Sequence, residues 1–395
     1  MKIAVLGTLD SKGHEHAFVA DAIRQRGHQP VLIDVGVGGD PQVAPDIPRT
    51  AILATLDRPG DRGACVTAMA AAVPEFVARL AAEGAIEGII SLGGGGGTSI
   101  GTAAMRALPL GFPKVMVSTL ASGNVAHYLG TKDIVMVPSI VDVAGLNRVS
   151  RAVFTRAAAA VCAMAEAGAA PPPGPERPLI VASMFGNTTD CINTARADLE
   201  AEGYEVLVFH ATGAGGRTME DLIATGLPTA VLDLTTTEIA DEVVGGTLSA
   251  GPDRLGANSD AGLPCVVAPG CVDMVNFGAR DTVPAEFAGR QFYIHNDQIT
   301  LMRTTPDENV RIAEFIATKL NSYPILPSVL LPLRGLSVIS APGGPFHHPE
   351  ADAALFQTLR AKLNPAIPVR EIDATINDPA FAHACSAALL ASLPA

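Results

Sequence analysis

The sequence predicts an α/β fold built from two Rossmann-like domains, each a doubly wound parallel sheet. Three observations support this prediction. Short apolar runs alternate with helical stretches, the same alternation restarts after a proline-rich segment, and glycine-rich or polar segments follow most of the runs. Alternation of this kind is typical of parallel sheets covered by helices on both faces. The length of 395 residues also exceeds what a single hydrophobic core usually holds.

The first domain is expected over residues 1–170. Helical stretches are expected between most of its apolar runs, including one from Gly13 to Gly27, where glycine ends the helix. An alanine-rich helix from about residue 145 to 168 completes the unit. The runs that we predict as strands are 2–7, 30–35, 87–92, 114–118 and 134–138.

A linker is predicted at 171–178, because its prolines stop the preceding helix and stiffen the chain. The second domain then covers 179–395. Residues 245–257 have no clear periodicity and predict a long loop. The predicted strands of this domain are 179–184, 205–209, 230–234, 265–268, 292–294 and 336–340.

Composition excludes several classes of partner. The net charge of −13 and the pI near 5.1 give no surface that would follow a nucleic-acid backbone, so we expect no nucleic acid. Six cysteines without a CxxC spacing indicate reduced thiols rather than a disulfide or zinc framework. The opening apolar run is too short for a signal peptide, and no apolar run approaches 18 residues. We therefore expect a cytoplasmic protein that does not enter a membrane.

The first candidate binding segment is residues 8–15, which end one strand and begin a helix. Ligands of open parallel sheets lie beyond the carboxyl ends of the strands. Backbone amides at the helix start suit an anion, Lys12 suits a phosphate, and Asp10 suits a hydroxyl or a hydrated Mg²⁺. Thr8 belongs to the same segment. The alternative is that Asp10 or Ser11 only caps the helix.

A second candidate is the run Gly93, Gly94, Gly95, Gly96, Gly97, followed by Thr98. Five consecutive glycines lose more backbone entropy than a turn requires, which indicates a ligand that touches the backbone. The run is neither a Walker A motif nor a good dinucleotide fingerprint. The alternative is a flexible connection between strand and helix.

A third candidate is the segment 118–124, rich in small donors, which adjoins the glycine loop if the two strands are neighbours. Ser118, Ser122 and Gly123 are its predicted contacts. Asp142, near the end of the next strand, is the predicted Mg²⁺ ligand. The alternative for each isolated residue is a solvated or capping role.

The second domain has its own polar loops after predicted strands. His210, Glu238 and Asp273 are the predicted acid and base residues, His295 is a further candidate, and Cys271 is a possible nucleophile. The alternatives are a hydrogen-bonded structural role for the histidines and an inert, buried role for the cysteine. No zinc, haem or iron–sulfur signature is present in the sequence.

These loops resemble a known family. The residues that carry the resemblance are GTLDSKGHE, GGGGGTS, ASGN, FHATGAGG and PGCVDMVNFG. They are similar to the ATP-binding domains found in a plant tobamovirus-resistance protein and in many uncharacterised bacterial proteins. The resemblance extends over nearly the whole chain. It implies ATP with Mg²⁺ on the N-terminal domain, at the candidate loops named above, and a homodimer.

The sequence thus predicts a nucleotide-binding protein, with two alternatives left open. The favoured interpretation is an enzyme in which ATP acts on a small metabolite at the second domain. The first alternative is a nucleotide-dependent protein-binding module without catalysis. The second is an ATP-independent lyase or hydrolase that uses the second-domain acid and base residues.

Overall fold

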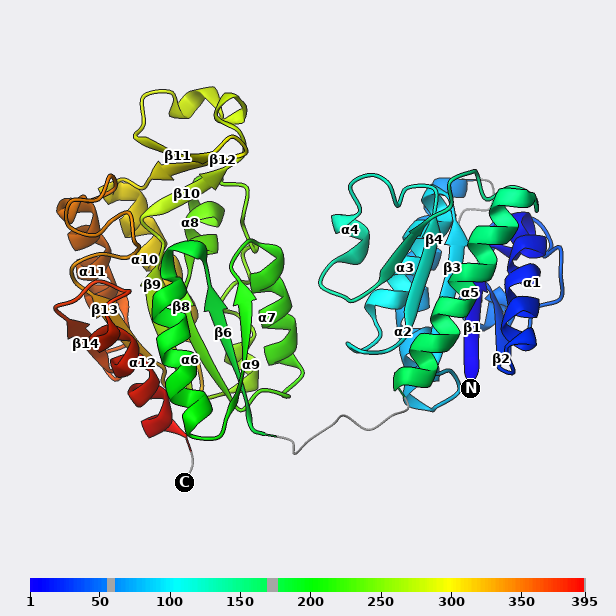
Figure 1. Ribbon diagram of the computed structural model, residues 1–395, viewed down its shortest axis with the longest axis horizontal. Helices are drawn as coiled ribbons and strands as arrows, with labels where there is room; N and C mark the ends of the chain where they lie inside the picture. Colours follow the sequence, from blue (N-terminus) through cyan, green and yellow to red (C-terminus); the bar gives the residue numbers. More distant parts are fainter. Residues whose placement is uncertain (55–60, 169–176, 394–395) are drawn as a thin grey trace. The chain divides into compact units, whose positions relative to one another are not determined.

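The computed structural model describes residues 1–54, 61–168 and 177–393. It divides into two compact units, residues 1–174 and 175–395. Most of the predicted linker lies outside the described residues. Both units are α/β, as predicted (Figure 1).

The N-terminal unit contains a five-stranded sheet of order β2-β1-β3-β4-β5 in which every neighbouring pair is parallel. The register aligns Gly93 at the end of β3 with Ser118 at the end of β4, and Ser118 with Pro138 at the end of β5. The loops that follow these strands therefore lie at one edge of the sheet. The strands are β1 (Lys2–Gly7), β2 (Gln29–Asp34), β3 (Gly88–Gly93), β4 (Lys114–Ser118) and β5 (Val135–Pro138).

Helices cover both faces of this sheet, because its strands are apolar on both sides. Helices α1 (Leu9–Gln25) and α5 (Arg148–Gly168) pack on one face, where Val19, Ile23 and Phe154 are fully buried. Helices α2 (Arg62–Ala82) and α3 (Gly95–Arg106) pack on the other. The single turn of α4 (Ala126–Leu129) follows the β4 loop.

Helix α2 is long and apolar enough to cross a membrane by length and composition, with a mean hydropathy of 1.4. Its buried residues recur every fourth position, at Cys65, Met69, Val73 and Val77. The last three belong to the core between the helices and the sheet. This single stripe is the pattern of a helix that covers one face of a sheet.

The C-terminal unit contains a six-stranded parallel sheet of order β14-β13-β9-β8-β6-β7. A separate three-stranded antiparallel sheet has the order β10-β12-β11. The parallel strands are β6 (Leu179–Met184), β7 (Glu205–His210), β8 (Ala230–Thr235), β9 (Cys265–Gly270), β13 (Ser328–Pro332) and β14 (Val369–Ile372). The antiparallel strands are β10 (Met274–Phe277), β11 (Phe292–Asn296) and β12 (Ile299–Arg303).

Two apolar cores lie on the two faces of the parallel sheet. Helices α6 (Thr189–Ala201) and α12 (Pro379–Ser392) cover one face. The other is covered by α7 (Ala214–Ala224), α8 (Thr237–Val244), α10 (Pro306–Leu320) and α11 (Pro349–Lys362). The predicted loop 245–257 precedes the short helix α9 (Asn258–Ala261).

One strand prediction in this unit is wrong, and another strand lies outside the parallel sheet. Residues 336–340 form a turn, because the hydroxyl of Ser340 accepts hydrogen bonds from the backbone N–H groups of Leu336 and Ser337. The strand in that part of the sheet is β13, which begins at Ser328, eight residues before the predicted start. Residues 292–294 do form a strand, but it pairs antiparallel with β12 outside the main sheet.

Candidate functional site

The glycine loop between β3 and α3 contains glycines of two kinds. Gly93 and Gly97 are required by close packing, since a Cβ atom on Gly93 would lie 2.7 Å from the Cα of Gly97. This approach allows α3 to begin directly after the strand. Any larger side chain at Gly93 would push the helix away from the sheet.

The three glycines between them are not required by packing. Among the described residues, a Cβ on Gly95 would meet nothing within 4 Å, and one on Gly94 or Gly96 would make only ordinary contacts at 3.7 and 3.4 Å. None of the three has the positive φ that favours glycine. No side chain caps α3, and within the described residues no acceptor is assigned to the N–H groups of Gly95, Gly96 and Gly97. Without side chains at these positions, the N–H groups of the first turn of α3 are open to contact. A ligand that binds the backbone needs such access.

Thr98 and Ser118 connect this loop to the neighbouring strand. Their hydroxyl oxygens lie 2.7 Å apart, and both residues are buried. The Ser118 oxygen also accepts a hydrogen bond from the backbone N–H of Leu120 at 3.0 Å. The two residues predicted as ligand contacts therefore bind each other and fix the positions of the α3 start and the β4 loop.

A pocket of about 270 Å³ opens at the carboxyl ends of β4 and β5. Three of the predicted residues line it: Ser118, Ser122 and Asp142. The predicted Gly123 is exposed beside the pocket and does not line it. The remaining lining residues are Thr119, Ser139, Ile140 and Val141.

Ile140 has a strained backbone in this pocket. Its φ is 65°, in the left-handed region that β-branched residues rarely adopt, and its side chain is 75 % exposed. Strain of this kind is concentrated at functional sites. Sequence reasoning did not identify Ile140, because an isoleucine after an apolar strand resembles its continuation.

The loop after β1 is held to the loop after β2 by two carboxylates. Asp34 accepts hydrogen bonds from the N–H groups of Leu9 (3.2 Å) and Gly36 (2.8 Å), and Asp10 accepts one from Gly38 at 2.6 Å. The second oxygen of Asp10 is buried and has no hydrogen-bond partner among the described residues. The predicted Thr8 is buried at the start of α1, and its hydroxyl accepts a hydrogen bond from Ser11.

Helix α1 is also tied to the segment that follows β5. The ammonium group of Lys12 donates to the carbonyl of Val143, and Glu15 accepts a hydrogen bond from the N–H of Gly145. Lys12 therefore holds this segment in place. The backbone of Lys12 itself departs from helical angles, with φ at −135°. The geometry joins the first candidate loop to the strand end that carries Asp142.

In the C-terminal unit, the carboxylate of Glu238 binds backbone N–H groups at the start of α7. The start of α3 in the N-terminal unit has no such partner among the described residues. The Glu238 carboxylate accepts hydrogen bonds from Gly213 (2.6 Å) and Gly216 (3.0 Å) at the start of α7. A Cβ on Gly216 would lie 2.0 Å from this carboxylate. Glu238 is completely buried, so its surroundings give it the role of an internal anion at a helix start rather than contact with a substrate.

Glu238 also binds a buried arginine, Arg254, which sequence reasoning did not identify. Arg254 donates to Glu238 at 2.8 Å, to both oxygens of Asp233 at 2.5 and 2.8 Å, and to Glu220 at 3.0 Å. The three carboxylates raise the pKa of Arg254 well above its ordinary value, against the effect of burial. No local motif signals this cluster, because its members are brought together only by the fold.

Asp273 is buried beside the turn that follows β9. One carboxyl oxygen accepts a hydrogen bond from Ser337 at 2.8 Å, and the other has no partner among the described residues. Burial raises the pKa of Asp273 to about 6, with Arg303 opposing and Asp352 adding to the shift. Cys271 is also fully buried, and burial raises the pKa of its thiol well above the usual value, which is the state of an inert cysteine.

His210 is the exposed member of the predicted catalytic set. Its ring stacks on Phe185, with centroids 5.4 Å apart. Glu238 and Asp273 bond to other groups and are shielded from solvent, so the three residues do not share one accessible centre. The further candidate His295 is exposed on β11. Among the described residues, no three His, Cys, Asp or Glu side chains are grouped to hold a metal.

Comparison with known proteins identifies relatives along the whole chain. Residues 1–170 match the N-terminal domain of an uncharacterised protein family (UPF0261), and residues 177–393 match its C-terminal domain. A UPF0261 protein of Clostridium tetani is 49 % identical over 397 residues, covering 98 % of both chains. One from Rhizobium meliloti is 46 % identical, again covering 98 % of both.

The ToMV resistance protein Tm-1(GCR237) of Solanum lycopersicum is 44 % identical over 329 residues. The match covers 82 % of this chain and 44 % of the tomato protein. Among solved structures, Acinetobacter baumannii MurG aligns over 93 % of this chain and 97 % of its own, with 12 % identity and a TM-score of 0.23.

The predicted resemblance to the tomato resistance protein and its bacterial relatives is therefore confirmed, whereas ATP binding is not part of the family's description and stays a prediction. The chain belongs to the uncharacterised protein family UPF0261.

Proposed function

We propose that this protein binds ATP, or a closely related nucleotide, with its phosphates on the first turn of α3. The observation that carries the proposal is the contrast between the two glycine-rich strand–helix loops. At α7 the chain places its own carboxylate, Glu238, on the helix start, and close packing accounts for Gly216. At α3, no described residue lies within 4 Å of a Cβ position on Gly95, and no described side chain caps the helix.

The donors available at α3 fit a phosphate group. Three consecutive backbone N–H groups and the positive end of a 12-residue helix dipole attract a dianion. The hydroxyls of Thr119 and Ser122 add donors on the adjacent loop. A pocket of about 270 Å³ is near the lower end of the size range of ligand sites, so it accommodates part of a nucleotide rather than all of it.

Asp142 would hold Mg²⁺ in this arrangement. Among the described residues that line the pocket, Asp142 is the one carboxylate, and none is a lysine or an arginine. A carboxylate beside a phosphate is repulsive unless a cation lies between them. Mg²⁺ is commonly held by one or two carboxylates together with phosphate oxygens, and it would supply charge neutralisation here.

We also propose that the protein acts on a small metabolite, with His210 as the acid or base residue. Of the three predicted acid and base residues, only His210 is accessible to a substrate, since Glu238 and Asp273 are completely buried. The burial of its two partners removes the support for an ATP-independent lyase or hydrolase built on the trio.

The test is calorimetric titration of the full chain with Mg²⁺-ATP. Gly95→Val and Gly96→Val meet no backbone or buried atom closely, so these variants should fold. Their branched side chains cover the amides, and we expect the dissociation constant to rise at least about tenfold. Gly289→Val, at an open position in the C-terminal unit, is the matched control and should bind as the wild type does. Wild-type protein that does not bind ATP would refute the proposal.

A nucleotide-dependent protein-binding module is the second candidate function. Two observations favour it: the tomato relative is named for resistance rather than for a reaction, and apolar side chains at Leu120 and Ile140 are exposed beside the pocket. A partner that is retained with Mg²⁺-ATP and released without it supports this function. Retention that is equal in both conditions contradicts it.

A further inference from the structure

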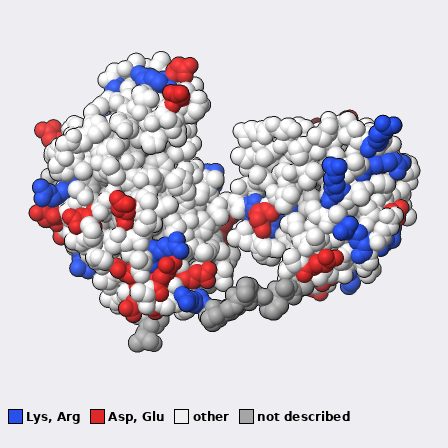
Figure 2. Space-filling view, in the orientation of Figure 1, with Lys and Arg blue, Asp and Glu red and all other residues white. Residues whose placement is uncertain are grey.

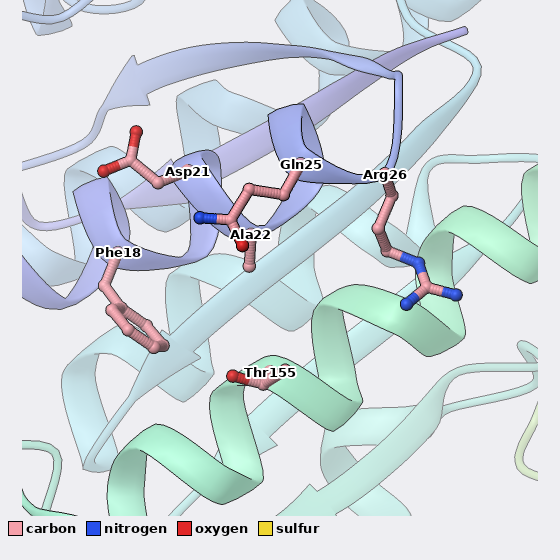
Figure 3. A pocket seen from close by; sticks show the side chains of 6 residues that line it. All are labelled: Phe18, Asp21, Ala22, Gln25, Arg26 and Thr155. Atoms are coloured by element: carbon pink, nitrogen blue, oxygen red, sulfur yellow. The ribbon is translucent and has the colours of Figure 1, made fainter.

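A second hollow in the N-terminal unit lies between helices α1 and α5. It has a volume of about 370 Å³. Its lining residues on and after α1 recur on one face of the helix, and Thr155 faces them from α5 (Figure 3). The complete lining consists of Phe18, Asp21, Ala22, Gln25, Arg26 and Thr155. We call this hollow the α1–α5 groove.

The groove is separate from the nucleotide site proposed above. Thr8, at the carboxyl edge of the sheet, precedes the first turn of α1, whereas Arg26 follows its last turn. A helix rises 1.5 Å per residue, so the two ends of this 17-residue helix are about 25 Å apart. The groove shares no lining residue with the pocket beside Asp142.

Positive charge without a matching acid borders the groove. Arg26 is exposed, and no ion pair is assigned to it among the described residues. The guanidinium of Arg151 lies over the Phe18 ring, 5.2 Å from its centroid. The carboxylate in the lining, Asp21, is bound to Arg24 at 2.6 Å.

The distribution of charge along the chain singles out this domain. Residues 1–174 contain 14 Lys and Arg and 14 Asp and Glu, whereas residues 175–395 contain 13 and 26. The whole net charge of −13 thus belongs to the C-terminal unit. Figure 2 shows basic side chains gathered over the α1 and α5 side of the N-terminal unit. An anion that approaches this face meets little of the repulsion expected from the overall charge.

We propose that the α1–α5 groove binds a small organic anion, in which a flat aromatic ring carries a phosphate or carboxylate group. Arg26 pairs with the anionic group, since a guanidinium matches both phosphate and carboxylate. The ring packs on Phe18 and Ala22, beside the Arg151 guanidinium. Thr155, Gln25 and Asp21 offer hydrogen bonds to polar ring substituents.

The volume supports a small ligand rather than a polymer. About 370 Å³ lies within the range of small-molecule pockets and encloses a bicyclic ring with one charged group. Both halves of the ligand are needed. A simple anion makes no apolar contact with Phe18 and Ala22, and a neutral ring leaves Arg26 unpaired.

The experiment is calorimetric titration of the full chain with 1-naphthyl phosphate, and with 1-naphthol as its neutral counterpart, in the presence of saturating Mg²⁺-ATP. We expect saturable binding of the phosphate with a dissociation constant below about 1 mM, and at least tenfold weaker binding of the naphthol. Arg26→Gln should weaken binding of the phosphate about tenfold or more. Arg156→Gln is the matched control, because it removes one exposed arginine from α5 without altering the groove lining.

A steric variant keeps the proposal open to refutation. Ala22→Trp fills the groove and should abolish binding, with an unchanged circular dichroism spectrum as evidence of folding. The proposal is overturned if the wild type does not bind 1-naphthyl phosphate, or if Arg26→Gln and Ala22→Trp bind it as well as the wild type. Loss of ATP binding in Gly95→Val leaves this result unaffected, because the two sites are distinct.

Discussion

The hydroxyls of Thr98 and Ser118 form a buried hydrogen bond of 2.7 Å between the first turn of α3 and the end of β4. The bond joins the start of α3, which follows β3, to the end of the neighbouring strand β4. Through it, the uncovered amides of the glycine loop are fixed relative to the pocket that Ser122 and Asp142 line. The proposed site depends on this relationship.

We expect Thr98→Val and Ser118→Ala each to lower the free energy of unfolding by about 1 to 2 kcal/mol, because each leaves a buried hydroxyl or amide unpaired. The double variant should cost less than the two changes combined, with a coupling energy on the order of 1 kcal/mol. Chemical denaturation of the four proteins measures this cycle. Strictly additive losses would show that the bond contributes nothing.

Glu238→Gln should destabilise the protein strongly. The change keeps an oxygen for Gly213 and Gly216 but removes the negative charge that Arg254 meets at 2.8 Å in a completely buried position. Breaking such a pair from one side costs about 3 to 5 kcal/mol, which lowers the melting temperature by on the order of 10 °C. His210→Ala, at an exposed position, is the comparison and should change the melting temperature little. Equal melting temperatures would contradict the structural role of Glu238.

The buried His16 makes the protein less stable at acid pH. Burial lowers the pKa of His16 from 6.5 to about 4, so between these values the unfolded chain binds the proton and the folded chain does not. Stability from this residue is full above about pH 6.5 and falls by about 3 kcal/mol as the pH drops to 4. His16→Gln, which cannot titrate, should lose less stability over that interval in calorimetric melts. Parallel curves for the two proteins would disprove the assignment.

Two buried aspartates act in the opposite direction. Burial raises the pKa of Asp241 to about 7 and that of Asp273 to about 6, so the folded protein binds protons that the unfolded chain releases. Their contribution to the free energy of unfolding therefore increases as the pH is lowered from about 7 to 4. Asp273→Asn can still accept the bond from Ser337, and it should flatten this increase below pH 6. Asp297→Asn, at an exposed turn, should leave the pH profile unchanged.

Much of the fold is predictable from the sequence. The ten strands that were both predicted and found include all five of the N-terminal sheet, where buried apolar runs end at turns. The short strand β14 escaped prediction because Arg370 and Glu371 interrupt its apolar pattern. At 336–340, hydroxyl bonds to the backbone override the β propensity of Val338 and Ile339.

The candidate site is only partly predictable. Glycine-rich loops signal places where the backbone is approached closely, but the sequence does not say what approaches it. At Gly216 it is the Glu238 carboxylate, and at Gly95 no group of the described residues lies within 4 Å of the position of a Cβ atom. Likewise, the sequence does not indicate that the side chain of His210 is exposed and that of Asp273 is buried. Those differences arise from the tertiary packing around each residue.

The most direct test of the proposed nucleotide site is the NMR response of the backbone amides of the α3 start. In full-length protein labelled with ¹⁵N-glycine, we predict that Mg²⁺-ATP shifts the amide signals of Gly95, Gly96 and Gly97, and that those of Gly213 and Gly216, already bonded to Glu238, do not move. Signals at Gly95 to Gly97 that stay unchanged at saturating nucleotide would contradict the account.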